Sequence, residues 1–210
     1  MVRSDEQRPL GRPRASDQTQ PTTESITEAA TQLFTKNGYQ TVSVNDVAKQ
    51  CNVTKATIYY YFPSKAELFT ETMVQMMIRI RKRINAMLHE PIPLKSRLYN
   101  ITKTHLSATV DIDINGFMKG TTHTLSPEQL ERINKAEMDM YQSIEQVFTH
   151  AMEQKEIREI NPVFATHAYL SLLKVGNYNN EKQAKIYDSI DEMAEQIIEL
   201  FWEGVQIKES

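Results

Sequence analysis

Residues 43–62 of the chain read SVNDVAKQCNVTKATIYYYF, and this stretch predicts two short helices joined by a tight turn. Ser43, followed three residues later by an aspartate, is typical of the start of a helix. Asn52 and the valine after it indicate the tight turn. Thr54 caps the second helix, which runs to about Tyr61, before a proline ends it.

Two short helices in this arrangement form a helix-turn-helix, whose second helix can lie in a DNA major groove roughly 12 Å wide. The motif needs a small residue where the helices cross and an apolar residue in the turn, and Ala48 and Val53 meet these needs. Ile58 and Phe62 are predicted to face inward. The polar face then displays Lys55, Thr57, Tyr59, Tyr60 and Tyr61.

Three consecutive tyrosines, Tyr59 to Tyr61, span most of a helical turn, so at least one must face solvent. Phenolic hydroxyls donate hydrogen bonds to phosphate oxygens, and aromatic rings can rest on thymine methyl groups. Lys65 follows Ser64 at the first turn of the next helix, where free backbone N–H groups attract an anion. The alternatives are that the tyrosines only pack the domain and that Lys65 is an ordinary solvated lysine.

Apolar residues recur at helical spacing through the rest of the chain. One helix is predicted to start with a capping box at Ser25–Glu28 and to end at Gly38, and a long one to start with a capping box at Ser64–Glu67 and to end at His89. Further helices are predicted at about Leu94–Val110, Pro127–Lys155, Pro162–Val175 and Glu181–Ile207, with 115–124 a short helix or an irregular link. We therefore expect an all-α fold.

The composition is that of a globular protein, with 40% hydrophobic and 24% charged residues among 210. The single cysteine, Cys51, excludes an internal disulfide, and there is no apolar run of transmembrane length. The N-terminus is polar and rich in proline, which is unlike a signal peptide, so we expect a cytoplasmic protein that does not contact membranes. The net charge is −3, divided as +2 over residues 1–66 and −5 over the rest. This asymmetry permits DNA binding without showing it.

The run AATQLFTKNGYQTVSVNDVAKQCNVTKATIYYYFPSKAELF, at 29–69, resembles the DNA-binding domain of the TetR family almost position for position. The matching residues are Leu33-Phe34, Gly38-Tyr39, Val47-Ala48, Val53-Thr54, Thr57-Ile58-Tyr59-Tyr60-Tyr61-Phe62 and Ser64-Lys65. One departure is Val44, where the family often has a hydroxyl residue that contacts phosphate. The resemblance covers about a third of the chain.

The resemblance implies an N-terminal three-helix DNA-binding domain at 23–69, with its motif at 43–62, and a C-terminal helical ligand-binding and dimerisation bundle at 70–210. Residues 1–22, rich in proline and arginine, are expected to be a disordered basic arm. The function implied is a homodimeric transcriptional regulator, a repressor that a small ligand releases from a palindromic double-stranded DNA operator. No catalytic residue, metal or cofactor is expected.

Carried over residue by residue, the resemblance assigns two kinds of DNA contact. The phosphate-positioning residues are Ser43, Tyr59, Tyr61 and Lys65, the base-reading residues are Lys55, Ala56, Thr57 and Tyr60, and Thr54 lies on the same surface. Arg12 and Arg14 lie in a Gly-Arg-Pro-Arg sequence that resembles arms entering narrow minor grooves. The alternative for the arm is a solubilising tail.

Two further sets of residues are predicted in the C-terminal part. Candidates for the ligand pocket are Met76, His105, Phe117, Met118, Tyr141 and Phe148, whose alternative role is plain core. Candidates for the dimer interface are Phe164, Ala168, Leu172, Ile190, Ile197 and Phe201. The apolar surface of the last helix is wider than one core-facing stripe, which indicates a partner subunit, although burial within one subunit is the alternative.

Three alternatives to a repressor are an enzyme, an interaction protein and an activator. The five histidines show no metal-binding spacing, and no nucleophile elbow, phosphate-binding loop or dinucleotide fingerprint is present, which argues against an enzyme. A protein whose helix-turn-helix serves only interaction is disfavoured by the exposed side chains of the motif. An activator with the same fold cannot be separated from a repressor by sequence.

Overall fold

The computed structural model describes residues 22–108, 121, 123–175 and 188–207, and all regular secondary structure within them is helical. The helices are α1 (Thr22–Asn37), α2 (Val44–Gln50), α3 (Lys55–Tyr61), α4 (Lys65–Leu88), α5 (Leu94–Ala108), α7 (Pro127–Glu153), α8 (Pro162–Val175) and α9 (Ile190–Val205). The predicted all-α fold is confirmed.

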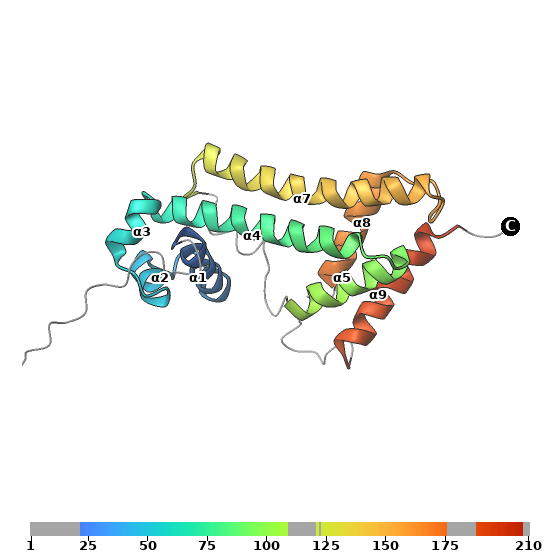
Figure 1. The fold of residues 1–210 in the computed structure, drawn as a ribbon, viewed down its shortest axis with the longest axis horizontal. Helices are drawn as coiled ribbons and strands as arrows, with labels where there is room; N and C mark the ends of the chain where they lie inside the picture. The colour runs from blue at the N-terminus through green and yellow to red at the C-terminus, as the bar shows by residue number, and fades with distance from the viewer. Residues whose placement is uncertain (1–21, 109–120, 122, 176–187, 208–210) are drawn as a thin grey trace, which may run out of the picture.

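The long helix α4 connects two groups of helices (Figure 1). Helices α1, α2 and α3 gather around its first half, at one end of the molecule. Helices α5, α8 and α9 pack near its second half, at the other end. Helix α7 runs alongside α4 over much of its length and contacts both α4 and α8. Any shift of α4 or α7 therefore changes how the two ends are placed.

The hydrophobic core consists of two clusters. The first joins α1, α2 and α3 to the first half of α4. In it, the Phe69 ring packs edge to face against two others, with its centroid 5.3 Å from that of Phe34 and 4.9 Å from that of Tyr39. This cluster also includes Ile133 and Met140 of α7. The second cluster fills the space between α5, α7, α8 and α9. The first cluster thus extends across residue 69, where the sequence predicts the domain boundary.

The helix starts of the motif form as predicted. The Ser43 hydroxyl accepts a hydrogen bond from the backbone N–H of Asp46, while the Asp46 carboxylate accepts one from the backbone of Ser43, which completes a capping box. The Thr54 hydroxyl accepts from the backbone N–H of Thr57. In the turn, Asn52 has a φ of 54°, a left-handed conformation that asparagine adopts more readily than most residues.

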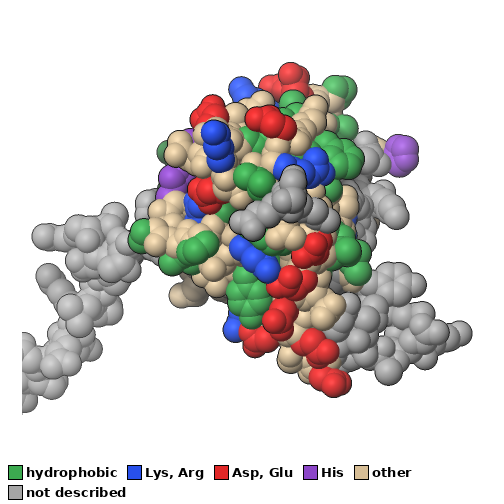
Figure 2. Space-filling view, turned by 90° about the vertical axis from the view of Figure 1, so that its right-hand side faces the viewer, with side chains coloured by type: hydrophobic (Ala, Val, Ile, Leu, Met, Phe, Trp, Pro, Cys, Tyr) green, Lys and Arg blue, Asp and Glu red, His purple; other side chains and the backbone are tan. Residues whose placement is uncertain are grey.

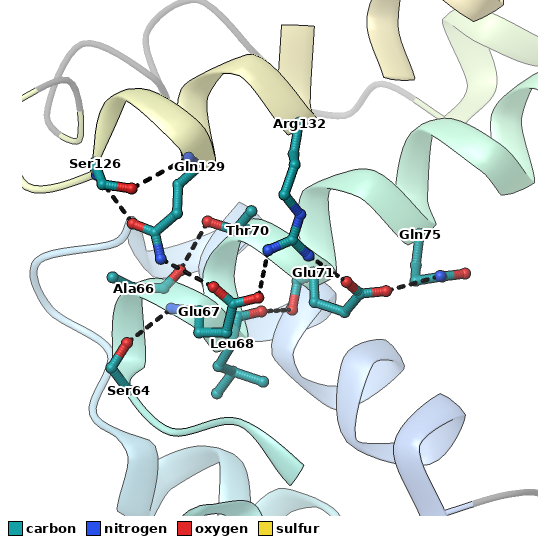
Figure 3. Close-up of polar contacts among 11 residues, drawn as sticks. Ser64, Ala66, Glu67, Leu68, Thr70, Glu71, Gln75, Ser126, Gln129 and Arg132 are labelled. Atoms are coloured by element: carbon teal, nitrogen blue, oxygen red, sulfur yellow. Dashed lines mark hydrogen bonds and ion pairs between the residues drawn. The ribbon is translucent and has the colours of Figure 1, made fainter. Parts of the chain in front are cut away.

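The two other predicted capping boxes are wrong in part. Helix α1 already includes Thr22, so Ser25 lies inside the helix and does not cap its start. At α4 the Ser64 hydroxyl does accept from the backbone of Glu67 at 3.0 Å. The Glu67 carboxylate, however, binds Gln129 and Arg132 of α7 instead of closing the box (Figure 3).

The C-terminal helices differ from the prediction at their ends. Helix α9 starts at Ile190, where the Ser189 hydroxyl caps it by accepting from Glu192 N at 3.1 Å, and residues 181–187 of the predicted range lie outside the described part of the chain. Helix α7 ends at Glu153, and Lys155 has a φ of 56°, which is incompatible with continuing the helix. The predicted link at 115–124 lies mostly outside the described residues. Across the described ranges, no helix is long and apolar enough to cross a membrane.

Candidate DNA-binding surface

The buried side of the motif holds α2 and α3 at a fixed angle. Val47, Ala48 and Ile58 are buried, and Phe62 closes the end of α3. The turn is fastened by a hydrogen bond from the backbone of Val53 to the carbonyl of Ala48, at 2.9 Å. These packed positions agree with the sequence prediction, and they leave the opposite face of α3 free to display side chains.

The three tyrosines of α3 are all exposed, as the prediction of at least one solvent-facing tyrosine requires. Tyr60 is 81% exposed, Tyr59 43% and Tyr61 40%. The rings of Tyr60 and Tyr61 meet edge to face with centroids 5.0 Å apart, while the Lys55 ammonium lies 5.6 Å from the Tyr59 ring centroid. The face therefore presents three exposed aromatic rings, each with a neighbour on the same helix, and Tyr60 is the most exposed of them.

Thr57 and Thr54 form a pair at the start of α3. Their hydroxyl oxygens lie 2.8 Å apart, and the Thr54 oxygen also caps the helix. Each hydroxyl thus has a partner within the protein, and a contact from the Thr57 hydroxyl to a base must compete with the one to Thr54. Lys55 and Ala56 are exposed beside them. The face offers one cation and two small apolar groups around Tyr60.

Ser43 lies at the start of α2 with its side chain committed to the capping box. Its hydroxyl donates to the Asp46 carboxylate at 2.6 Å, and hydrogen bonds from the Ser43 side chain and backbone lower the pKa of Asp46. A phosphate contact from this hydroxyl must therefore compete with Asp46. Val44, the departure from the family pattern, is buried and so offers no polar group to DNA.

Lys65 is held in place by the loop between α1 and α2. Its ammonium donates to the carbonyl of Gln40 at 3.3 Å and lies 4.3 Å from the Tyr39 ring centroid. Partial burial lowers the pKa of Lys65, and the nearby charge of Asp46 opposes this effect. Sequence reasoning missed the part that Tyr39 plays, because the ring is 25 or more residues away from the lysine that it orients.

Not every predicted site residue lies in the described part of the chain. Arg12 and Arg14 of the arm, and Phe117 and Met118 of the predicted pocket, fall outside it. Among the described residues, no group of three or more His, Cys, Asp or Glu side chains is placed to hold a metal ion.

The remaining pocket candidates are spread over both core clusters. Met76 and Tyr141 belong to the first cluster, whereas Phe148 is buried in the second. The Tyr141 hydroxyl donates to Glu137, and burial together with that bond raises the pKa of Tyr141. His105 of α5 is half-buried, and this desolvation lowers its pKa.

The predicted dimer residues divide into two groups. Phe164 and Ile190 are exposed, at 65% and 40%, and Ala168 and Leu172 are half-buried. Ile197 and Phe201 are each only 5% exposed, and the Phe201 ring packs 5.3 Å from that of Tyr169 in the same subunit. Both side chains therefore pack in the subunit's own core. Leu200, which the sequence analysis does not name, is 65% exposed.

Comparison with known proteins finds a family match in the N-terminal part of the chain. Residues 26–72, which contain most of α1, all of α2 and α3, and the start of α4, match the family model for bacterial regulatory proteins of the tetR family. The helix-turn-helix and the helices around it are thus similar to the DNA-binding domain of that family.

Sequence relatives are transcriptional regulators, and solved structures share the fold over most of the chain. The chain is 26% identical to the HTH-type transcriptional regulator YhgD of Bacillus subtilis, over 75% of this chain and 83% of that protein. It is 24% identical to the fatty acid metabolism regulator protein of the same organism, over 64% and 70%. The reduced form of NemR from E. coli shares the fold with a TM-score of 0.71, at 17% identity over 88% and 97% of the two chains. FadR from Bacillus subtilis, solved with stearoyl-CoA, gives a TM-score of 0.64 at 22% identity over 85% and 96%.

Proposed function

We propose that this protein is a dimeric repressor of the TetR family that binds a palindromic operator through α3 and leaves it when a small ligand binds the helices behind α4. The main support for DNA binding by α3 is its exposed face, where 81% of the Tyr60 side chain is exposed, whereas Ile58 on the opposite face is fully buried. A large aromatic ring on a rigid, well-packed helix is suited to contact with a base or a sugar in the major groove.

The proposed DNA contacts are assigned to side chains of the motif and of the start of α4 that face solvent. Tyr59, Tyr61 and Lys65 supply donors to phosphate oxygens around α3, with Ser43 at the start of α2. The base-reading set is Lys55, Ala56, Thr57 and Tyr60, with Thr57 contributing its methyl group. Arg12 and Arg14 of the arm are proposed to enter the neighbouring minor groove.

Dimerisation through α8 and α9 is supported by exposed apolar side chains on both helices. Phe164, Val175 and Leu200 are each more than half exposed. Figure 2 looks at the end of the molecule away from α1, α2 and α3, and it shows hydrophobic side chains beside a band of acidic ones. A two-fold pair would place two α3 helices on successive major grooves, about 34–36 Å apart.

Repression and release by a ligand are supported by similar proteins. IcaR of Staphylococcus aureus, a negative regulator, is 34% identical over 50 residues, which is 24% of this chain. FadR was solved with stearoyl-CoA bound. We therefore propose an apolar ligand with a polar head, and stearoyl-CoA is the probe with which to begin.

The proposal is tested by selecting bound pieces from fragmented genomic DNA of the source organism. One shared, roughly palindromic site, from which stearoyl-CoA displaces the protein, is the expected result. Retention that is weak and blind to sequence would overturn the repressor function and favour a protein whose motif serves only interaction. Site-specific binding that stearoyl-CoA leaves intact would overturn the proposed ligand class alone.

A further inference from the structure

The first turns of α4 and α7 are joined by a fork of hydrogen bonds from one arginine (Figure 3). Arg132 of α7 donates from Nη1 to Glu67 Oε1 at 2.5 Å and from Nη2 to Glu71 Oε2 at 2.8 Å. The two glutamates lie four residues apart and therefore on one face of α4. A planar guanidinium that binds two carboxylates fixes direction as well as distance.

The remaining carboxylate oxygens of this network are also paired. Glu67 Oε2 accepts from Gln129 Nε2 at 3.0 Å, and Glu71 Oε1 accepts from Gln75 Nε2 at 2.8 Å. Gln129 in turn accepts from the backbone N–H of Ser126, the residue that caps α7. A continuous chain of hydrogen bonds thus links the N-terminus of α7 to the N-terminal turns of α4.

The network holds the part of α4 that carries the DNA-binding groups. Glu67 lies two residues after Lys65, and α3 ends at Tyr61, just before the start of α4. Beneath the polar groups, Ile133 of α7 packs in the same core cluster as the buried residues of the motif. The start of α7 therefore binds the start of α4 through polar groups, and its Ile133 shares an apolar cluster with the DNA-binding helices.

The alternative is that this network is a surface ion pair that contributes only a little to the stability of the fold. The side chain of Arg132 is 38% exposed, with Glu67 at 27% and Glu71 at 28%, and partly exposed pairs contribute little to unfolding free energy. A second pair between the same helices, Arg81 with Asp139 at 3.5 Å, makes a single, longer contact farther along α4. The fork differs from it in geometry and position rather than in strength alone.

We propose that Arg132 is a positioning residue, whose fork on Glu67 and Glu71 fixes the orientation of α1, α2 and α3 relative to the C-terminal helices and so pre-organises α3 for DNA. Without the fork, the DNA-binding helices sample a wider range of orientations about the start of α4. Ordering them then costs free energy on binding. The consequence for DNA affinity rests on the proposed function, whereas the orientation itself does not.

The orientation is tested by spin-label distances in the full chain. Cys51→Ser removes the native thiol, and labels at Lys36→Cys on α1 and Glu195→Cys on α9, both at exposed positions, report the distance between the two ends. Labelled protein is diluted with unlabelled protein so that distances within one chain dominate. We expect Arg132→Gln to broaden the distribution of distances, and Arg81→Gln, which removes the same charge from the same pair of helices, to leave it unchanged. Equal widths in all three proteins would overturn the proposal.

DNA affinity gives a second readout that charge alone cannot mimic. Arg132→Gln removes a positive charge and Glu67→Gln a negative one, so simple electrostatics moves the Kd for DNA in opposite directions. The positioning role predicts that both substitutions weaken binding to the selected fragment, by about three- to tenfold. Opposite changes would contradict it. If the unsubstituted protein selects no DNA site, the proposed function fails, while the spin-label distances still decide the positioning role.

Discussion

Removing the Lys65 ammonium should change the salt dependence of DNA binding by a calculable amount. The structure holds this ammonium beside the Tyr39 ring and the Gln40 carbonyl, so it is a fixed charge next to α3 rather than a mobile one. Each phosphate contact contributes about 0.9 to the slope of log K against log salt. Lys65→Gln in both subunits of a dimer should therefore lower the magnitude of the slope by about 1.8.

The same slope gives the expected loss of affinity. Extrapolated from 1 M to 0.15 M salt, a slope difference of 1.8 amounts to about 30-fold weaker binding, and the two proteins should converge as salt rises. Fluorescence anisotropy with the selected fragment at several salt concentrations measures both quantities. Lys95→Gln is the matched control, since Lys95 lies on α5 and pairs with Glu199 at 2.6 Å. An unchanged slope for Lys65→Gln, or equal changes in both variants, would refute a direct phosphate contact.

Three other predictions concern the base-reading face, the subunit contact and the start of α4. Tyr60→Ala should relax sequence preference at one position of each half-site by about 1–3 kcal/mol, with little change in unfolding free energy because the ring is exposed. Competition with single-base variants of the site measures this preference, and uniform weakening across all variants would argue against base reading. Leu200→Glu should dissociate the dimer in sedimentation experiments, since it places a charge on an exposed apolar position, and a dimer that persists would move the interface away from α9. Burial alone would raise the pKa of Glu67, but hydrogen bonds from Arg132 and Gln129 and the charge of Arg132 lower it overall. The stabilisation that the ionised Glu67 contributes is therefore present above the unfolded pKa of about 4.3 and is lost as pH falls below it, so the unfolding free energies of the protein and of Glu67→Gln should converge in acid. A constant difference between the two unfolding free energies down to about pH 3 would contradict this.

The parts of the structure that could be predicted from sequence depend on neighbouring residues. Ser43 and Asp46 are three residues apart, and their capping box needs nothing from elsewhere in the chain. The same holds for Thr54 at the start of α3 and for Asn52 in the turn. The buried Ile58 and the exposed Tyr60 follow from the helical period within one short element.

The parts that could not be predicted depend on contacts between distant residues. Glu67 has the spacing of a capping box, but Arg132, 65 residues later, takes its carboxylate. Ile197 and Phe201 are apolar residues on a strongly amphipathic helix, and their sequence does not tell whether the second subunit or α7 and α8 cover them. Within the subunit, the Phe201 ring packs against those of both Phe148 and Tyr169.

The most direct test of the account is chemical protection of the major groove on the selected DNA fragment. Methylation of guanine N7, an atom that lies in the major groove, is measured with and without the protein. If α3 reads the major groove, we expect protected positions in two successive major grooves, with centres one helical turn apart, and loss of the protection in Tyr60→Ala. Protection of the minor groove alone, or protection that persists unchanged in Tyr60→Ala, would contradict the claim that α3 is the reading helix.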